Sequence, residues 1–128
     1  MNTCSVGQAA PAHKGPAVGV SRADMRRAGV DPENARLWHV EDGVDAVPTG
    51  AFVGIDLTDT ELTTRTAGEL YLVLLAGKPC LRFLVPNKGR IATATTEPGP
   101  YSINPPGSVE IIGRVFWFGR HRWRWQPE

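Results

Sequence analysis

The sequence predicts one mainly β domain, a compact curled sheet of several strands with a single short helix near its N-terminal side. Three observations indicate this class. The 128 residues allow one real hydrophobic core, the 11 prolines and 14 glycines require many turns, and the apolar runs are short and rich in strand formers. Residues 1–20 are Ala/Gly/Pro/Ser-rich without an apolar period, which predicts a flexible arm. The domain itself is expected over residues 21–128.

The predicted helix spans residues 22–28. Ser21 is a suitable N-cap, Asp24 stands at the third helical position as in a capping box, and Gly29 stops the helix. Residues 31–36 allow one further helical turn. Beyond it the chain has strand character, first over residues 37–40 and then, after a polar loop, over residues 51–57.

The stretch GELYLVLLAGKPCLRFL predicts the central β-hairpin. Its apolar runs, residues 70–75 and 80–85, are separated by Gly77 and Pro79, which suit a turn and not the inside of a paired strand. The length of the first run predicts a strand buried on both faces. Arg82 is the polar residue that interrupts the second run. Either its stem packs while its head reaches water, or the strand presents a cation to a site.

After the hairpin, the sequence predicts a turn and then a strand over residues 91–95. Residues 97–107 contain four prolines, which exclude regular structure and favour an extended surface crossing. The last predicted strand covers residues 109–118.

Composition excludes several classes of function. The net charge of +1 gives no global attraction to nucleic acid or to an anionic membrane. No apolar run approaches the roughly 20 residues of a membrane span, and no signal peptide is visible, so we expect a cytoplasmic protein. The three histidines are scattered and Cys4 and Cys80 are isolated, so free thiols and no metal are expected. No glycine-rich phosphate loop indicates a cofactor.

Three segments, in their order along the chain, resemble the C-terminal domain of LexA-like phage repressors and of UmuD-type mutagenesis proteins. They are EDGVDAVPTGAFVGID, GELYLVLLAGKPCLRFL and PYSINPPGSVEIIGRVFWFGR. The resemblance covers about residues 21–120. Its most specific parts are the strand PTGAFVGID, the hairpin with its turn glycine, and VEIIGRVFW. It implies a curled mostly-β fold that dimerises, with a Ser/Lys dyad that cuts the protein's own N-terminal linker when RecA filaments are present.

The resemblance also implies where that dyad would lie, and both positions differ here. Counting back from Gly50, the nucleophilic serine falls on Asp42, and the general-base lysine, five residues after Gly77, falls on Arg82. Arginine stays protonated at physiological pH and cannot act as that base, and a carboxylate offers no hydroxyl to activate. We therefore expect vestigial positions, with no catalytic residue. A salt bridge between Asp42 and Arg82 would close the old site; the alternative is that each is solvated independently.

The tail alternates arginines with aromatic residues. Three interpretations stay open: contact with a partner or a second copy, an aromatic row in the core with solvent-reaching arginines, or stacking on a single-stranded nucleic acid. The first is favoured, because in the resembled family the strand after VEIIG lies near the dimer seam. The expected contact residues are Arg114, Phe116, Trp117, Phe118, Arg120, Trp123 and Trp125.

Two classes of function follow. The first is a non-catalytic dimerisation module of phage or prophage origin, pairing with itself and acting on a LexA-like repressor or RecA. The second is a self-processing peptidase of UmuD type, for which Val6–Gly7 and Val18–Gly19 are conceivable bonds. The altered dyad favours the first. Direct binding of single-stranded nucleic acid through the tail is a lesser alternative.

Overall fold

The computed structural model describes residues 22–119 and confirms a mainly β fold with a short helix. Seven strands form one antiparallel sheet in the order β1-β2-β7-β3-β4-β5-β6. The elements, in chain order, are α2 (Arg22–Arg27), the 3-10 turn η1 (Pro32–Asn34), β1 (Ala35–His39), β2 (Phe52–Asp56), β3 (Glu69–Leu75), β4 (Lys78–Asn87), β5 (Arg90–Ala94), β6 (Ser102–Ile103) and β7 (Val109–Gly119). The predicted arm, residues 1–20, and the cap Ser21 lie outside the described residues.

The short helix α2 ends close to its predicted boundary. Its first turn carries Asp24 and its last turn carries two arginines, which complements the helix dipole. Gly29 follows with φ of 82°, a left-handed conformation that costs glycine little. The further turn predicted over residues 31–36 is shorter than expected. Asp31 caps η1 by accepting a hydrogen bond from the Glu33 N–H at 3.0 Å, and the chain enters β1 at Ala35.

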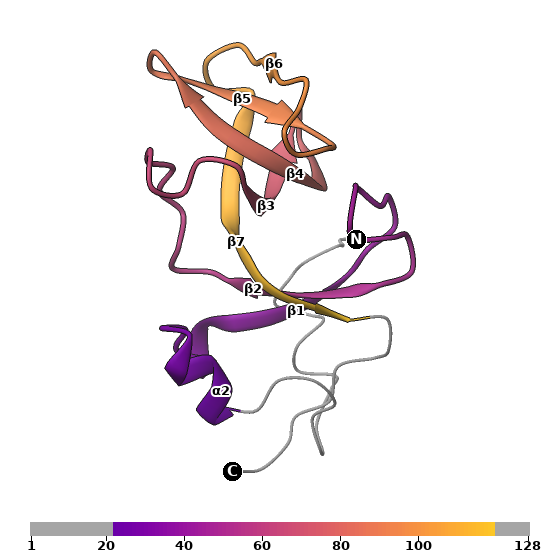
Figure 1. The fold of residues 1–128 in the computed structure, drawn as a ribbon, viewed down its shortest axis with the longest axis vertical. Helices are drawn as coiled ribbons and strands as arrows, with labels where there is room; N and C mark the ends of the chain where they lie inside the picture. Colours follow the sequence, from indigo (N-terminus) through magenta and orange to yellow (C-terminus); the bar gives the residue numbers. More distant parts are fainter. Residues whose placement is uncertain (1–21, 120–128) are drawn as a thin grey trace.

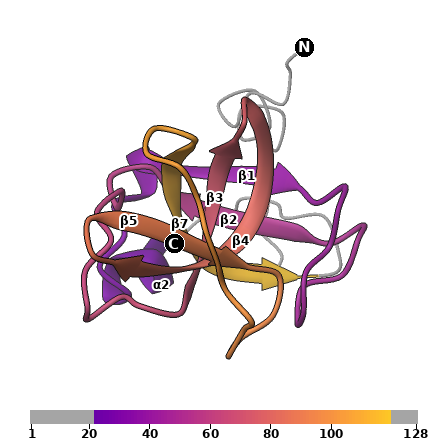
Figure 2. The ribbon, with the colours of Figure 1, turned by 90° about the horizontal axis from the view of Figure 1, so that it is seen from above.

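The long strand β7 joins the two halves of the sheet (Figure 1). Its first half pairs with β3 and its second half with β2, and Arg114 stands opposite both Tyr71 and Asp56. Two register shifts leave Ile112 and Phe116 as extra residues on β7. Bulges of this kind bend a strand and increase its twist. The curl of the sheet, seen from above in Figure 2, therefore has a local cause on either side of Arg114.

The central hairpin is longer than predicted. Ala76 and Gly77, with φ of 53° and 84°, form the two-residue turn, and Pro79 lies inside β4 opposite Leu74. The expectation that Pro79 stays outside a paired strand was wrong. The pair Leu75 and Lys78 flanks the turn, so the next pair is a non-hydrogen-bonded one and the Pro79 nitrogen points away from β3. On that side β5 reaches only as far as Phe83, so no ladder bond is lost.

The proline-rich crossing also contains one short strand that was not predicted. β6 pairs with β5 through only two residue pairs, and the Asn104 N–H donates to the Ile91 carbonyl at 3.0 Å. Proline excludes regular structure only at its own positions, and Ser102 and Ile103 are not prolines. The prediction that the whole segment lacks regular structure was therefore wrong at these two residues.

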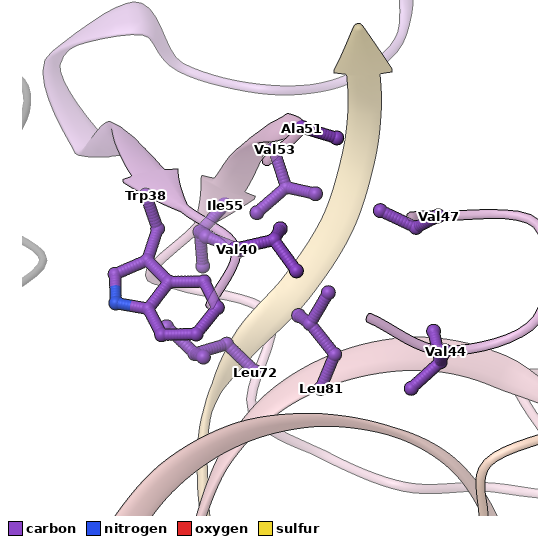
Figure 3. Close-up of a cluster of buried hydrophobic side chains, with 9 residues drawn as sticks. All are labelled: Trp38, Val40, Val44, Val47, Ala51, Val53, Ile55, Leu72 and Leu81. Carbon is purple, nitrogen blue, oxygen red and sulfur yellow. The ribbon is translucent and has the colours of Figure 1, made fainter. Parts of the chain in front are cut away.

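The core consists of three clusters of buried hydrophobic side chains. The largest lies inside the curl (Figure 3) and contains Trp38, Val40, Val44, Val47, Ala51, Val53, Ile55, Leu72 and Leu81. A second packs α2 against β1 through Met25, Val30, Ala35 and Leu37. The third covers the other face of the hairpin with Tyr71, Val73 and Leu84. Clusters on both faces of β3 bury Tyr71, Leu72 and Val73 completely, which confirms the prediction of a strand buried on both faces.

Candidate functional site

The loop that carries Asp42 is a tightly tied structure between β1 and β2. Val40 and Ala51 close its base, with the Val40 N–H donating to the Ala51 carbonyl at 2.9 Å. Val44 and Val47 bridge each other and turn their side chains into the largest core cluster (Figure 3). Asp42 itself is exposed. The loop is therefore anchored by valines, while its acidic residue stays at the surface.

Gly43 explains how the loop closes so tightly. Its N–H donates to Thr49 Oγ1 at 2.9 Å, across the loop. A Cβ added at Gly43 would lie 2.5 Å from the Thr49 nitrogen and 2.8 Å from the Val47 oxygen. Both atoms belong to the backbone, so a side chain does not fit at this position.

Arg82 lies on β4, opposite Tyr71 of β3. Cys80 is two residues earlier on the same strand and so points to the same face. Burial raises the pKa of the Cys80 thiol, the Arg82 cation lowers it, and the Asp42 carboxylate raises it. Both charges therefore act on Cys80, which means that the fold brings the Asp42 loop and the Arg82 strand into one neighbourhood.

The predicted salt bridge is not present among residues 22–119. Asp42 and Arg82 form no ion pair there. Arg82 instead donates from Nη1 to the Leu81 carbonyl oxygen at 2.7 Å, a contact with its own strand. The expectation of a bridge was wrong in this respect, because spacing along the sequence places two residues near each other but does not fix the direction of a long side chain.

This arrangement has little capacity for nucleophilic chemistry. Arg82 remains a cation at any physiological pH and accepts no proton. Cys80, whose pKa is raised, holds its proton at neutral pH and is then a weak nucleophile. Cys80 was not selected from the sequence as a site residue. The available signal was its position two residues before Arg82 in a predicted strand, which puts both side chains on one face.

The residues expected to contact a partner occupy different environments on β7. Phe116 and Trp117 are partly buried and pack against the cluster around Met25 and Leu37. The bulge explains why neighbours in one strand pack on the same cluster, since the extra residue interrupts the alternation of faces. Phe118 keeps 48% of its surface exposed. The other expected contacts, Arg120, Trp123 and Trp125, lie outside the described residues.

Arg114, another of the expected contact residues, forms ion pairs within the domain. Its Nε donates to Asp59 Oδ2 at 2.6 Å, and its Nη1 lies 3.8 Å from Glu69 Oε1. Burial by itself would lower the pKa of Arg114, but the hydrogen bond and charge of Asp59, together with the charges of Glu69 and Asp56, raise it. Neither Asp59 nor Glu69 was selected from the sequence as a site residue. The signal that was missed is a cation in the middle of an apolar strand, which requires a partner when it is buried.

No protein-family model matches this chain, and no curated protein shows significant similarity. Among residues 22–119, no group of histidine, cysteine, aspartate and glutamate side chains is arranged to hold a metal ion. That part of the chain also contains no helix of the length and apolar character needed to cross a membrane.

Proposed function

We propose that this chain is a non-catalytic interaction module of the LexA and UmuD type, which pairs with a second copy and through such pairing acts on a related repressor or on RecA. The observation that carries the proposal is the neighbourhood of Asp42, Cys80 and Arg82. On the resemblance, the positions of the family's hydroxyl and titratable lysine carry a carboxylate, Asp42, and a guanidinium, Arg82, and both charges act on the Cys80 thiol. Neither group supports the cleavage chemistry.

We propose the outer part of β7 as the pairing surface. Phe118, on β7, has 48% of its surface exposed. In the resembled family, the corresponding strand lies near the dimer seam. Large exposed aromatic groups are typical of the centre of protein interfaces. Arg114 is already bound to Asp59 within the domain, so the proposed surface rests on Phe118 and not on Arg114. That ion pair also engages one arginine of the set that would contact a nucleic acid, which favours a protein partner over direct nucleic-acid binding.

Light scattering at micromolar concentration tests the pairing. We expect about twice the chain mass of 13.9 kDa for the unaltered protein, and a shift toward the monomer for Phe118→Ser. Ile103→Ser is the matched control, since Ile103 is 53% exposed on β6 and lies on another strand. A monomer for the unaltered protein, or an equal shift in both variants, would contradict a seam at Phe118.

The same preparation tests the absence of cleavage. Protein held at alkaline pH, where members of the resembled family cleave without RecA, is expected to keep its intact mass. A product that begins at Gly7 or Gly19 would overturn the non-catalytic assignment and favour the self-processing peptidase. Tight binding of single-stranded DNA with a steep salt dependence would favour the nucleic-acid alternative.

A further inference from the structure

Residues 57–68 connect β2 to β3 and lie over the Tyr71 face of the sheet; we call this segment the strap. It runs beside β7 between the two halves of the molecule (Figure 1). Apart from its turns it contains no regular structure. Most of its side chains between Thr58 and Ala67 are exposed, and the exceptions, Asp59, Leu62 and Thr66, are partly buried.

Both ends of the strap are fixed by hydrogen bonds. At the start, Asp56 Oδ1 accepts from the Thr58 N–H at 3.1 Å and from the Thr58 hydroxyl at 2.8 Å, and the Leu57 N–H donates to the Asn34 carbonyl at 3.0 Å. At the end, the Gly68 N–H donates to the Leu84 carbonyl at 2.8 Å. The strap therefore has two anchored ends, one on each half of the sheet.

The middle of the strap is fastened in a different way. Arg114 holds Asp59 at 2.6 Å, the Tyr71 hydroxyl donates to the Glu61 carbonyl at 3.5 Å, and Leu62 packs against the cluster of Tyr71, Val73 and Leu84. A bond of 3.5 Å from a neutral hydroxyl is weak. The contact with Arg114 is short and joins two charges whose side chains are only 22% and 28% exposed. Such charge-assisted bonds are the stronger class.

The position of Arg114 gives this contact its importance. Arg114 is the residue at which β7 changes its partner from β3 to β2, and Glu69, at the start of β3, lies 3.8 Å from its Nη1. One side chain thus meets the strap and the first residue after it, at the junction of the two halves. We propose that the strap opens and closes as a unit over the Tyr71 face, and that Arg114 is its latch.

Hydrogen–deuterium exchange of the intact chain, followed by mass spectrometry, tests this device. In Arg114→Gln, the amides of residues 57–68 are expected to exchange roughly tenfold faster, since a hydrogen bond to a charged group shifts a local equilibrium by about that factor or more. The β3–β4 hairpin is expected to keep its exchange rate. Arg114→Lys, which keeps the charge but loses the Nε donor, is expected to fall in between.

Asp59→Asn provides the test from the strap side and does not alter β7. It is expected to loosen the same peptides, and combining it with Arg114→Gln is expected to add little, because both changes remove one bond. Arg27→Gln is the matched control, since Arg27 pairs with Asp24 on α2, away from the strap.

Unchanged exchange of the strap in both Arg114→Gln and Asp59→Asn would overturn the proposal. So would an equal increase in the hairpin, which would indicate general destabilisation. The outcome does not depend on the dimer, so the latch and the proposed function can fail separately.

Discussion

At the scale of single residues, the most informative group is the thiol of Cys80. It is partly buried on β4. The Arg82 cation lowers its pKa and the Asp42 carboxylate raises it. Burial makes the largest contribution and raises its pKa, because the thiolate is the form that loses hydration. The reactivity of Cys80 therefore reports the charges at Asp42 and Arg82, even though these two residues form no ion pair with each other.

Cys80 is expected to react with iodoacetamide at a higher pH midpoint than an ordinary cysteine. Asp42→Asn removes a negative charge that disfavours the thiolate, so the midpoint is expected to fall. Arg82→Gln removes a cation that favours it, so the midpoint is expected to rise. The measurement is the alkylation rate against pH in a Cys4→Ser background, with Glu33→Gln on η1 as the control. Midpoints that do not move in either variant would show that these charges do not reach the thiol.

The same residues show what spacing could predict. Counting from Gly50 and Gly77 selected a loop residue and a strand residue whose charges both act on Cys80. The spacing could not predict that Arg82 donates to the Leu81 carbonyl, because that contact depends on several side-chain torsions. Nor could it predict the pairing of Arg114 with Asp59, since these residues are far apart in the sequence and meet only when β7 pairs with β2 and β3.

At the scale of elements, β7 determines the shape of the sheet. Its boundaries were almost fully predictable from an apolar run in a strand pattern, whereas its two bulges were not. A bulge depends on where the partner strands end and on the space between them, which no local pattern records. Gly113 shows this well. The closest neighbour of a Cβ at this position would be the Asp56 oxygen, at 2.3 Å, so the end of β2 lies tightly against the backbone of β7 here.

Gly113→Ala is expected to lower the free energy of unfolding by about 3 kcal/mol, because overpacking against backbone atoms forces the strands apart. The Ile55 side chain, 2.7 Å from the same Cβ, adds to the crowding. Urea unfolding measures the change, and Glu110→Ala, an exposed site on the same strand, is the control. A loss below about 1 kcal/mol would mean that the spacing between β2 and β7 can widen at little cost.

At the scale of the whole molecule, the two halves of the sheet share one strand, β7. The cluster around Met25 and Leu37 belongs to the half with α2, and the cluster around Tyr71 and Leu84 belongs to the other. The central cluster draws residues from both halves, including Trp38 of β1 and Leu81 of β4 (Figure 3). Loss of either outer cluster is therefore expected to weaken the entire sheet.

Leu37→Ala and Leu84→Ala are each expected to cost about 2–5 kcal/mol, as for other fully buried leucines. Each is expected to move a single unfolding transition. In a background with Trp123→Phe and Trp125→Phe, tryptophan fluorescence reports Trp38 and Trp117, which lie on β1 and β7, while far-UV circular dichroism reports every strand. For Leu84→Ala the two signals are expected to shift by the same urea concentration. Separate transitions would show that the halves unfold independently.

The order of the strands also bears on the synthesis of the protein. β7 is the last of the seven strands to leave the ribosome, yet it stands between β2 and β3 in the finished sheet. Until it emerges, the edges of β2 and β3 that it will cover have no partner, and unpaired edges readily join other chains. The nascent chain can form the β1–β2 and β3–β4–β5 ladders early, because these connect neighbours in sequence. Closure of the domain waits for β7, and the interval before it arrives is when the growing chain is most exposed to misassembly.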